Sequence, residues 1–517
     1  MKWAVRLYAV LFIGAVVAGL FFHNTLVQKQ DFSLRLLHTN DHHAHLEAVE
    51  VGDRLLGGIS RRKTLVDTLR SRSPEPTLLL DAGDIFQGTL YFNQYLGRAD
   101  LPFYNQMNYA AVAVGNHEFD RGQQPLADFI KEAEFPLLSA NLEIDANSPL
   151  AGAIAPWIIL TVNGQEIGIF GLTTEETPIL SSPGEGVKFT DPIAAAKEAV
   201  KTLGDQGVNK IIALTHLGFF EDLELAQNVG GIDVIIGGHS HTPLGNMPGA
   251  DEPYPVVEIS PEGDPVLVVT DWEWGKYLGD LQVRFDGRGR AIAWSGSPHP
   301  VEGTIPADEA FETQLQAFKE PLEELRNLVI GKTEKLLDGD RANVRSRDTN
   351  LGNLIADAIL QKMRPDGGEI AIVNGGGIRS SIPAGDVTVG QVIEVLPFGN
   401  TIARMDLTGE QIKQALEHGV SGVEEGEGGF PQVAGIRFAW NPESPAGSRV
   451  KSVDIIRPDG TTKPLDLNAT YRVISNSFLM DGGDGYEVFK TAKNRVDTGF
   501  LMSDVVVDYI RDRSPIR

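Results

Sequence analysis

Short apolar runs that alternate with helical patterns fill the first half of the chain. Each run is bounded by glycine or polar residues, which is typical of buried strands. Apolar residues recur at helical spacing near 59–69, 98–108 and 125–132. Strands that alternate with helices predict an α/β layer structure whose sheet faces are covered. The predicted strands are 34–38, 77–80, 109–114, 167–172, 211–215, 234–236, 266–270 and 278–285.

The pattern changes from Pro306 to Leu328, where apolar residues recur at helical spacing among charged ones. This predicts one amphipathic helix, which we interpret as a linker. The segments after it are punctuated by glycine-rich loops and include predicted strands over 370–373 and 402–407. The chain is therefore expected to divide into these parts: 1–30, 31–305, the linker helix 306–328, and 329–517.

The N-terminus predicts export. Lys2 and Arg6 precede an apolar run over 7–22, which is the arrangement of an export signal. The run is slightly short for a full membrane span, and no small-residue cleavage site stands out before Asp31. Residues 1–30 are therefore expected to be a signal peptide or an uncleaved membrane anchor, and the protein is expected to be periplasmic or extracellular.

Composition excludes several kinds of chemistry. The formal net charge of the 517 residues is −25, so a nucleic acid is not an expected partner, because its phosphates would be repelled. A small phosphorylated substrate stays compatible with this charge if metal ions or clustered arginines reverse the local field. The chain has no cysteine, which excludes disulfides, zinc–thiolate sites and thiol nucleophiles.

Metal-binding residue types follow several predicted strands of the first half. Carboxylates, imidazoles and one amide at one rim form the mixed oxygen and nitrogen set that Zn, Mn, Fe or Co accepts. Two pairs alternate, Asp41 with His43 and His239 with His241, so each pair is expected to point one way from an extended segment. The candidate ligands are Asp41, His43, Asp84, Asn116, His216, His239 and His241.

Asp84 stands on a tight glycine turn and is the best candidate to bridge two cations. Two metals about 3.5–4 Å apart polarise a phosphoryl group and generate hydroxide at neutral pH. His117 lies in Gly-Asn-His-Glu-Phe-Asp, and Asp120 can orient its imidazole if the chain turns there. Other histidines of this region are interpreted as hydrogen-bonded structural residues: His38, His42 and His45.

Polar and aromatic residues in loops of the second half predict a ligand site. Asn374 and Arg379 flank a glycine run, where the backbone can approach a ligand closely. Phe398 follows a proline, and Phe478 precedes a Gly-Gly-Asp-Gly loop that contains Asp484. Loop aromatics are typical platforms for stacking a base, although an arbitrary phenylalanine is more often part of a core.

The ordered motifs Asp-x-His, Gly-Asp, Gly-Asn-His-Glu, Thr-His and Gly-His-x-His resemble the signature of the calcineurin-like metallophosphoesterases. The glycine run from Asn374 to Arg379, the Leu-Pro-Phe-Gly around Phe398 and the Asp484 loop resemble the C-terminal domain of the 5′-nucleotidase family. The resemblance covers nearly the whole chain after Asp31. It implies an α/β (α+β) protein with an N-terminal four-layer β-sandwich flanked by helices, a linker helix and a C-terminal α/β substrate-binding domain.

The resemblance implies two divalent metal ions, Zn, Mn or Co, and a role for each candidate residue. Water activated at the metals would attack phosphorus, while His117, oriented by Asp120, would stabilise the transition state. Some relatives carry glutamine where this chain has His241, which leaves the metal at that position open. The implied ligands are Asp41, His43, Asp84 and His241 for one ion, and Asp84, Asn116, His216 and His239 for the other.

The same resemblance implies that a nucleotide is recognised in the second half. Phe398 and Phe478 would sandwich the base, and Asp484 would bind the ribose hydroxyls. The remaining contacts, to the base or to the phosphate end, would come from Asn374, Arg379 and Arg347, with Arg345 and Arg341 as alternatives to Arg347.

The predicted function is that of an exported dimetal phosphohydrolase that releases phosphate from nucleoside 5′-monophosphates. A 2′,3′-cyclic nucleotide phosphodiesterase/3′-nucleotidase is the nearest alternative, and a UDP-sugar pyrophosphatase activity could coexist. A thiosulfate-releasing hydrolase is less favoured, because the paired phenylalanines and Arg379 suit a nucleotide. An alternative of another class is a non-catalytic nucleotide-binding surface protein, against which the intact ligand set, His117 and Asp120 argue.

Overall fold

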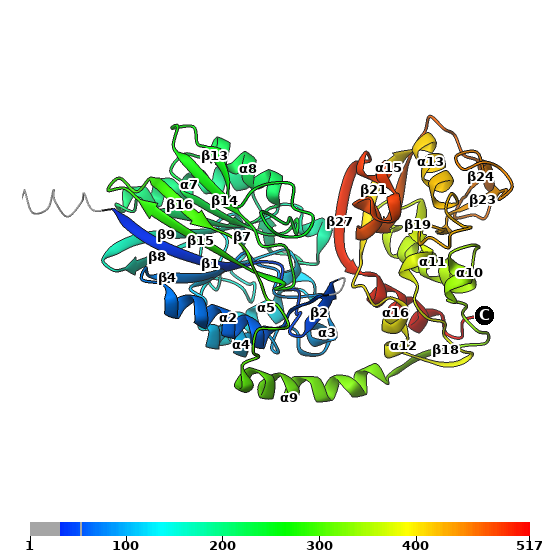
Figure 1. Cartoon of the computed structure of the whole chain (residues 1–517), viewed down its shortest axis with the longest axis horizontal. Coiled ribbons are helices and arrows are strands. Elements are labelled where there is room, and N and C mark those ends of the chain that lie inside the picture. Colours follow the sequence, from blue (N-terminus) through cyan, green and yellow to red (C-terminus); the bar gives the residue numbers. More distant parts are fainter. Residues whose placement is uncertain (1–30, 52–53) are drawn as a thin grey trace, which may run out of the picture. The chain divides into compact units, whose positions relative to one another are not determined.

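The computed structural model describes residues 31–51 and 54–517, and Figure 1 shows its helices and strands. The signal or anchor predicted over 1–30 lies outside the described residues. The chain divides into two compact units, Met1–Phe318 and Lys319–Arg517. This division falls inside helix α9 (Glu309–Arg326), within the segment interpreted as a linker. Among the described residues, no helix is both long and apolar enough to span a membrane.

The first unit contains a mixed seven-stranded sheet. Its strands are β1 (Phe32–Thr39), β4 (Thr77–Asp81), β5 (Ala111–Ala113), β6 (Leu137–Leu138), β15 (Tyr277–Phe285), β16 (Ala291–Gly296) and β17 (His299–Pro300). Their order is β16-β15-β1-β4-β5-β6, with β17 paired to β15. Strands β1, β4, β5 and β6 run parallel, so their carboxyl ends meet at one edge of the sheet.

A six-stranded sheet forms the second β-layer of this unit. Its strands are β8 (Trp157–Val162), β9 (Gln165–Thr173), β11 (Ile211–His216), β12 (Val234–Gly237), β13 (Val256–Ile259) and β14 (Pro265–Val269). The order is β13-β14-β12-β11-β9-β8, and the four central strands are parallel. The apolar runs that the sequence pattern predicted as strands are confirmed in both sheets. Two short antiparallel pairs are also present in this unit: β2 (Ala48–Val51) with β3 (Arg54–Gly57), and β7 (Leu142–Ile144) with β10 (Val187–Phe189).

The helices of the first unit are α2 (Ile59–Arg72), α3 (Leu90–Tyr95), α4 (Leu101–Met107), α5 (Gln123–Glu132), α6 (Thr177–Leu180), α7 (Pro192–Asp205) and α8 (Phe219–Asn228). The helix predicted over 98–108 is shorter than expected, and α3 was not among the predicted helices. Leu96 and Gly97 have φ angles of +52° and +86° and end α3 before α4 begins. A Cβ atom on Gly97 would lie 2.1 Å from the Phe86 ring, so only glycine fits at this turn.

The core of the first unit lies between its two sheets. Leu36 and Ala111 of the first sheet pack in one buried cluster with Ile212 and Ile236 of the second. Helices α7 and α8 cover the outer face of the second sheet, while α2 and α4 lie along the first (Figure 1). Because both faces of each sheet are covered, the parallel strands are nearly continuous apolar runs.

The second unit is built on a five-stranded sheet in the order β22-β19-β26-β21-β27. Helix α11 packs against α16 and against β19 and β22, and α13 packs against β21. The strands of the unit are β18 (Val329–Thr333), β19 (Ile370–Asn374), β20 (Gly385–Thr388), β21 (Thr401–Thr408), β22 (Pro431–Ala434), β23 (Ile436–Trp440), β24 (Val450–Ile456), β25 (Thr462–Pro464), β26 (Thr470–Asn476) and β27 (Lys493–Leu501). Its helices are α10 (Arg341–Val344), α11 (Asn350–Met363), α12 (Val389–Val395), α13 (Gly409–Gly419), α14 (Ser477–Met480), α15 (Glu487–Lys490) and α16 (Met502–Arg513).

A buried carboxyl group in α8 makes the stability of the first unit depend on pH. The Thr215 hydroxyl donates to Oδ1 of Asp222 at 2.7 Å, and Asp222 is 1% exposed. Burial raises the pKa of Asp222 from 3.8 to about 8, so the folded state retains a proton that the unfolded state releases. The stabilisation from this proton is complete below the unfolded pKa. It is lost at about 1.4 kcal/mol per pH unit as the pH rises toward the folded pKa.

Asp222→Asn preserves an acceptor for Thr215 and has no proton to lose. We expect the free energy of unfolding of this variant to fall less steeply than that of the wild type between about pH 5 and pH 8. Urea titrations in the presence of a chelator measure both curves without a contribution from bound metal. Curves that run parallel through this range would show that Asp222 is not protonated in the folded protein.

Candidate metal centre

Polar side chains converge where parallel strands of the two sheets end. Asp41 follows β1, Asp84 follows β4 and Asn116 follows β5, at one edge of the first sheet. His216 ends β11 in the second sheet. The two edges adjoin, since Nδ1 of His216 lies 2.8 Å from the carbonyl oxygen of Ala82. The carboxyl edge of the parallel strands is where ligands bind in open α/β sheets.

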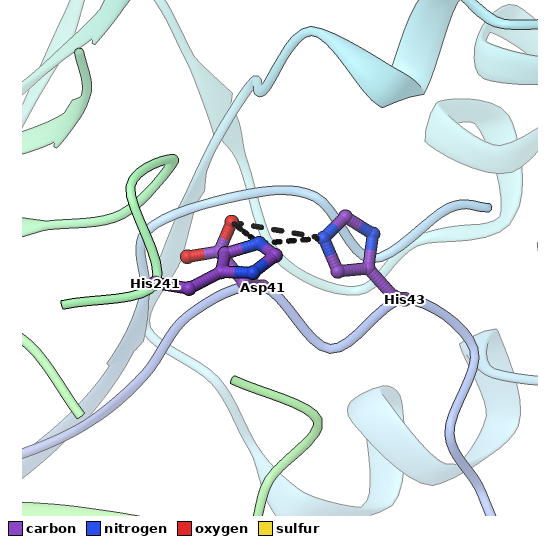
Figure 2. Close-up of side chains that lie close together, drawn as sticks. All are labelled: Asp41, His43 and His241. Carbon is purple, nitrogen blue, oxygen red and sulfur yellow. Dashed lines mark hydrogen bonds and ion pairs between the residues drawn. The ribbon is translucent and has the colours of Figure 1, made fainter. Parts of the chain in front are cut away.

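Asp41, His43 and His241 form the first of two candidate metal groups, shown in Figure 2. The potential ligand atoms of this group all lie within 4.8 Å of one another. Nε2 of His241 is 3.1 Å from Nε2 of His43 and 3.3 Å from Oδ1 of Asp41. Burial lowers the pKa of His43 to about 4, so its imidazole is neutral at pH 7 and can offer a lone pair to a cation.

Asp84, His216 and His239 form the second group. Burial lowers the pKa of His239 to about 3, so this imidazole is also neutral at pH 7. Among the described residues, Oδ1 of the buried Asn116 and Nε2 of His216 have no hydrogen-bond partner. Nε2 of His216 does lie 2.9 Å from Oδ2 of Asp84. Buried polar atoms without partners are costly, so this donor set fits a divalent cation.

Asp84 lies between the two groups. Its Oδ2 atom is 2.9 Å from Nε2 of His216 and 3.9 Å from Nε2 of His43, and its Oδ1 atom accepts from the N–H of His117 at 2.9 Å. Burial alone would raise the pKa of Asp84, but the imidazoles of His216, His117 and His43 lower it well below its ordinary value. Asp84 is therefore a carboxylate placed to bridge two cations. Divalent ions held here would act as Lewis acids on a phosphoryl group and activate water.

The ligand-bearing backbone is not extended, so the expectation that each pair points one way from an extended segment is wrong about the backbone, although Asp41 and His43 do lie in one group. The N–H of His43 donates to the carbonyl oxygen of Asp84 at 2.9 Å, which fixes one turn against the other. Residues other than glycine rarely have positive φ, and such strain clusters at functional sites. The orientation of the candidate ligand side chains is therefore set by tight turns and not by the alternation of residues along a strand. The φ angles are +50° at Asp41, +49° at His43, +57° at Asp84, +77° at His239 and +49° at His241.

His117 begins the short 3₁₀ turn η1 (His117–Phe119), and the turn expected between His117 and Asp120 is present. Nδ1 of His117 lies 2.8 Å from Oδ2 of Asp120, and the Ser181 hydroxyl donates to the other carboxylate oxygen at 2.7 Å. Nε2 of His117 is 4.0 Å from Oδ2 of Asp84. Burial alone would lower the pKa of His117, but Asp120 and Asp84 raise it to about 10. A cationic imidazole beside both metal groups can stabilise developing negative charge.

Glu118 holds two ligand-bearing turns together, a role that the sequence interpretation missed. Its Oε2 atom accepts from the N–H groups of Asp84 and Gly115 at 3.0 and 2.7 Å. Its Oε1 atom accepts from those of Ile85 and Phe86 at 2.8 and 3.1 Å. Four backbone N–H groups thus converge on the two oxygens of one buried carboxyl group. They tie the turn after β4 to the turn after β5.

Four of the candidate recognition residues of the second unit lie close to one another: Asn374, Asp484, Arg379 and Phe398. Asn374 ends β19, and its Nδ2 donates to Oδ2 of Asp484 at 2.7 Å. The guanidinium of Arg379 lies 5.4 Å from the centroid of the Phe398 ring, and Phe398 and Asn374 line one pocket. Phe398 and Phe478 are 49% and 43% exposed, so neither is a core residue and both can stack on a ligand.

Arg347 lies apart from this set. Its side chain is 61% exposed and forms an ion pair with Asp338 at 3.2 Å. Arg345, the alternative named above, donates from Nη1 to the carbonyl oxygen of Gly426 at 2.8 Å. Burial and neighbouring guanidinium groups, that of Arg379 among them, lower the pKa of Arg345. The structure therefore groups Arg345 with Arg379.

Comparisons with known proteins match both units. Residues 34–243 match the family model for calcineurin-like phosphoesterases, and residues 329–491 match the model for the 5′-nucleotidase C-terminal domain. The chain is 40% identical over 508 residues to the snake venom 5′-nucleotidase of Naja atra, with coverage of 93% of this chain and 96% of the relative. It is also 40% identical over 515 residues to the trifunctional nucleotide phosphoesterase protein of Bacillus subtilis (strain 168). That match covers 93% of this chain but only 34% of the longer relative.

A solved structure supports the same assignment. The 5′-nucleotidase precursor from Thermus thermophilus is 49% identical to this chain, with a TM-score of 0.63 and coverage of 93% of this chain and 96% of that one. The fold and the matched models define a metal-dependent phosphoester hydrolase with two candidate metal-binding groups. The chain belongs to the 5′-nucleotidase family. The two-domain α/β architecture that the sequence resemblance implied is confirmed.

Proposed function

We propose that this protein is a dimetal phosphohydrolase that releases phosphate from nucleoside 5′-monophosphates. The observation that best supports the proposal is that the two metal groups meet at Asp84, with His117 beside both. Family membership supports the same reaction class. The proposed ligands are Asp41, His43, Asp84 and His241 for one ion, and Asp84, Asn116, His216 and His239 for the other.

In this proposal the side chains of the first unit orient the phosphate and stabilise charge. His117 presents Nε2 toward the phosphoryl group and stabilises the charge that develops on the leaving oxygen. Asp120 accepts the Nδ1 proton and fixes the ring, and the Ser181 hydroxyl in turn fixes Asp120. No side chain is required as a nucleophile, because ions held by these ligands would activate water for attack on phosphorus.

The second unit is proposed to select the nucleotide. Phe398 and Phe478 stack on the base, and Asp484 binds the ribose hydroxyls. Asn374 supports Asp484 through its hydrogen bond and, with Arg379, contacts the ligand. We assign the further arginine contact to Arg345, since Arg347 is paired with Asp338 and Arg345 lies among the other guanidinium groups.

Phe478→Ala tests the stacking proposal. Loss of one base–aromatic contact costs about 1–3 kcal/mol, so the Michaelis constant for AMP should rise roughly 5- to 150-fold. The Michaelis constant for p-nitrophenyl phosphate, which has no nucleobase, should change much less. Leu467→Ala, which truncates another exposed apolar residue of this unit (41% exposed), is the control and should leave both constants unchanged. An equal effect of Phe478→Ala on both substrates would remove the stacking role.

A substrate panel separates the proposal from its alternatives. AMP, 2′,3′-cyclic AMP and UDP-glucose are tested on one preparation, and AMP is expected to be hydrolysed fastest. The name of the Bacillus subtilis relative, a trifunctional nucleotide phosphoesterase, makes activity on a second ester compatible with the proposal. Activity on the cyclic ester with none on AMP would favour the cyclic phosphodiesterase. If the metal-loaded protein hydrolyses none of the three substrates, the result would favour a non-catalytic nucleotide-binding protein.

We also propose that the protein is exported. The support is the charged and apolar pattern of Lys2, Arg6 and 7–22, together with a relative named as a venom enzyme. Fractionation of cells that express the full chain should place phosphate release outside the cytoplasm. Activity that sediments with membranes would indicate an uncleaved anchor, and activity confined to the cytoplasm would contradict export.

A further inference from the structure

Glu273 follows the end of a parallel strand and reaches a proposed metal ligand. It lies four residues after β14 ends at Val269, in Trp-Glu-Trp-Gly-Lys. Oε2 of Glu273 is 2.8 Å from Nδ1 of His241. The other ring nitrogen of His241 faces Asp41 and His43, as Figure 2 shows. The imidazole of His241 is therefore held between a carboxylate on one side and a candidate metal group on the other.

A cation between two aromatic rings fixes the Glu273 carboxylate. Nζ of Lys276 donates to Oε1 of Glu273 at 2.5 Å. The same Nζ lies 4.0 Å from the ring centroids of both Trp272 and Trp274, so it makes two cation–π contacts. The side chains of Glu273 and Lys276 are only 14% and 4% exposed. The ion pair is therefore little screened by solvent, and its carboxylate has one well-defined position.

The backbone on both sides of Glu273 is strained. Trp272 and Trp274 have φ angles of +76° and +58°, a conformation that is unusual for bulky residues. Two hydrogen bonds hold them there. The side chain of Asn40 donates to the carbonyl oxygen of Trp272 at 2.6 Å. The backbone N–H of Trp274 donates to the carbonyl oxygen of Asp41 at 2.7 Å. Strain persists where the surroundings over-determine it, and here they fix Glu273 relative to the Asp41 loop.

We propose that Glu273 is a positioning residue that sets the metal affinity of the group formed by Asp41, His43 and His241. It accepts the Nδ1 proton of His241, which fixes the ring and leaves the Nε2 lone pair for the ion. This inference rests on the proposed dimetal function and deepens it. The effect is confined to one group, because His216 of the other group places its Nδ1 against a backbone carbonyl instead.

The test compares purified full-length wild type with Glu273→Gln and Glu273→Ala. Zinc content and stepwise zinc affinities are measured by chelator competition, and the visible spectrum is recorded after cobalt substitution. We expect one of the two affinities to fall about 10- to 100-fold and the other to stay unchanged. The loss should be smaller for glutamine, which retains an acceptor, and the cobalt spectrum of one site should change. Glu258→Gln, whose carboxylate accepts from Gln227 on the surface, is the matched control and should keep both affinities.

Thermal unfolding of the metal-free variants separates positioning from simple structural support. Glu273→Gln, which retains an acceptor for Lys276 and His241, should unfold within a few degrees of the metal-free wild type, whereas Glu273→Ala leaves the buried Lys276 without its partner and is expected to be less stable. Unchanged stepwise affinities would overturn the inference. The inference would also be overturned if both metal affinities fell in parallel and the metal-free variants lost much of their stability. A wild type that binds fewer than two ions would overturn this inference and the proposed function together, whereas two bound ions without phosphate release would reject only the proposed function.

Discussion

Replacing Asp84 with alanine is expected to lower phosphate release from AMP by at least on the order of a thousandfold. The variant should also retain at most one tightly bound divalent ion. The physical reason is that Oδ2 of Asp84 lies 2.9 Å from Nε2 of His216 and 3.9 Å from Nε2 of His43, so one truncation removes the carboxylate that faces both groups and is proposed to bridge them. Elemental analysis of the purified variant and its turnover with AMP measure the two effects on the same sample.

Two further variants separate the loss of charge from the loss of fold. Asp84→Asn preserves the shape of the side chain and removes its charge, so it should bind metal more weakly than wild type but better than the alanine variant. Asp222→Asn is a matched control, because Asp222 is as buried as Asp84, at 1% exposed, and belongs to neither metal group. It should retain both ions. An alanine variant that still holds two ions and retains turnover within about tenfold of wild type would rule out a bridging Asp84.

His117→Ala is expected to lower turnover by about 10²- to 10³-fold with no change in metal content. His117 is not a member of either metal group, and its Nε2 atom lies 4.0 Å from Asp84. Its truncation therefore removes a charge-stabilising group and leaves the ligands in place. Turnover with AMP, together with metal content, checks both halves of this expectation.

The leaving group gives a sharper version of the same test. If His117 stabilises charge on the leaving oxygen, a substrate with a good leaving group needs it less. The loss for His117→Ala should then be smaller with p-nitrophenyl phosphate than with AMP. Asp120→Asn should show the same pattern more weakly, since it loosens the ring that Asp120 now holds at 2.8 Å. Equal losses on both substrates, or unchanged turnover, would contradict this role.

The strand-end motifs could be predicted because they depend on local sequence and on one simple rule of topology. Apolar runs in the sequence predicted β1, β4, β5, β11 and β12, and residues of metal-binding type follow or end each run. Parallel strands then bring their carboxyl ends to one edge. That logic needed no knowledge of loop conformation. It accounts for why the residues of both metal groups were named from sequence.

The backbone conformation of the ligand-bearing turns could not be predicted from the sequence pattern. Asp41 and His43 were expected on an extended segment, yet both have φ near +50°. Positive φ is uncommon even for Asp and His, so tertiary contacts hold it here, such as the hydrogen bond from the N–H of His43 to the carbonyl oxygen of Asp84. Such contacts join residues that are distant in sequence and leave no local signal.

Supporting residues were missed for different reasons. Glu118 carried no distinguishing signal, because its partners are backbone N–H groups that any sequence offers. Glu273 was accessible in principle, since it follows the predicted strand 266–270 at the same sheet edge. Arg347 was preferred to Arg345 from sequence, because both flank Ser346 and the pattern gave no sign that the guanidinium of Arg345 is near that of Arg379.

Phosphate release from AMP by the full-length protein, measured before and after removal of metal, is the most direct test of the central claim. Zn, Mn or Co is returned one at a time, and metal content is determined at each stage. The proposed dimetal mechanism predicts that activity disappears with the metals and returns with at least one of them, in step with occupation of two sites per chain. Undiminished phosphate release from protein shown to contain no metal would contradict it.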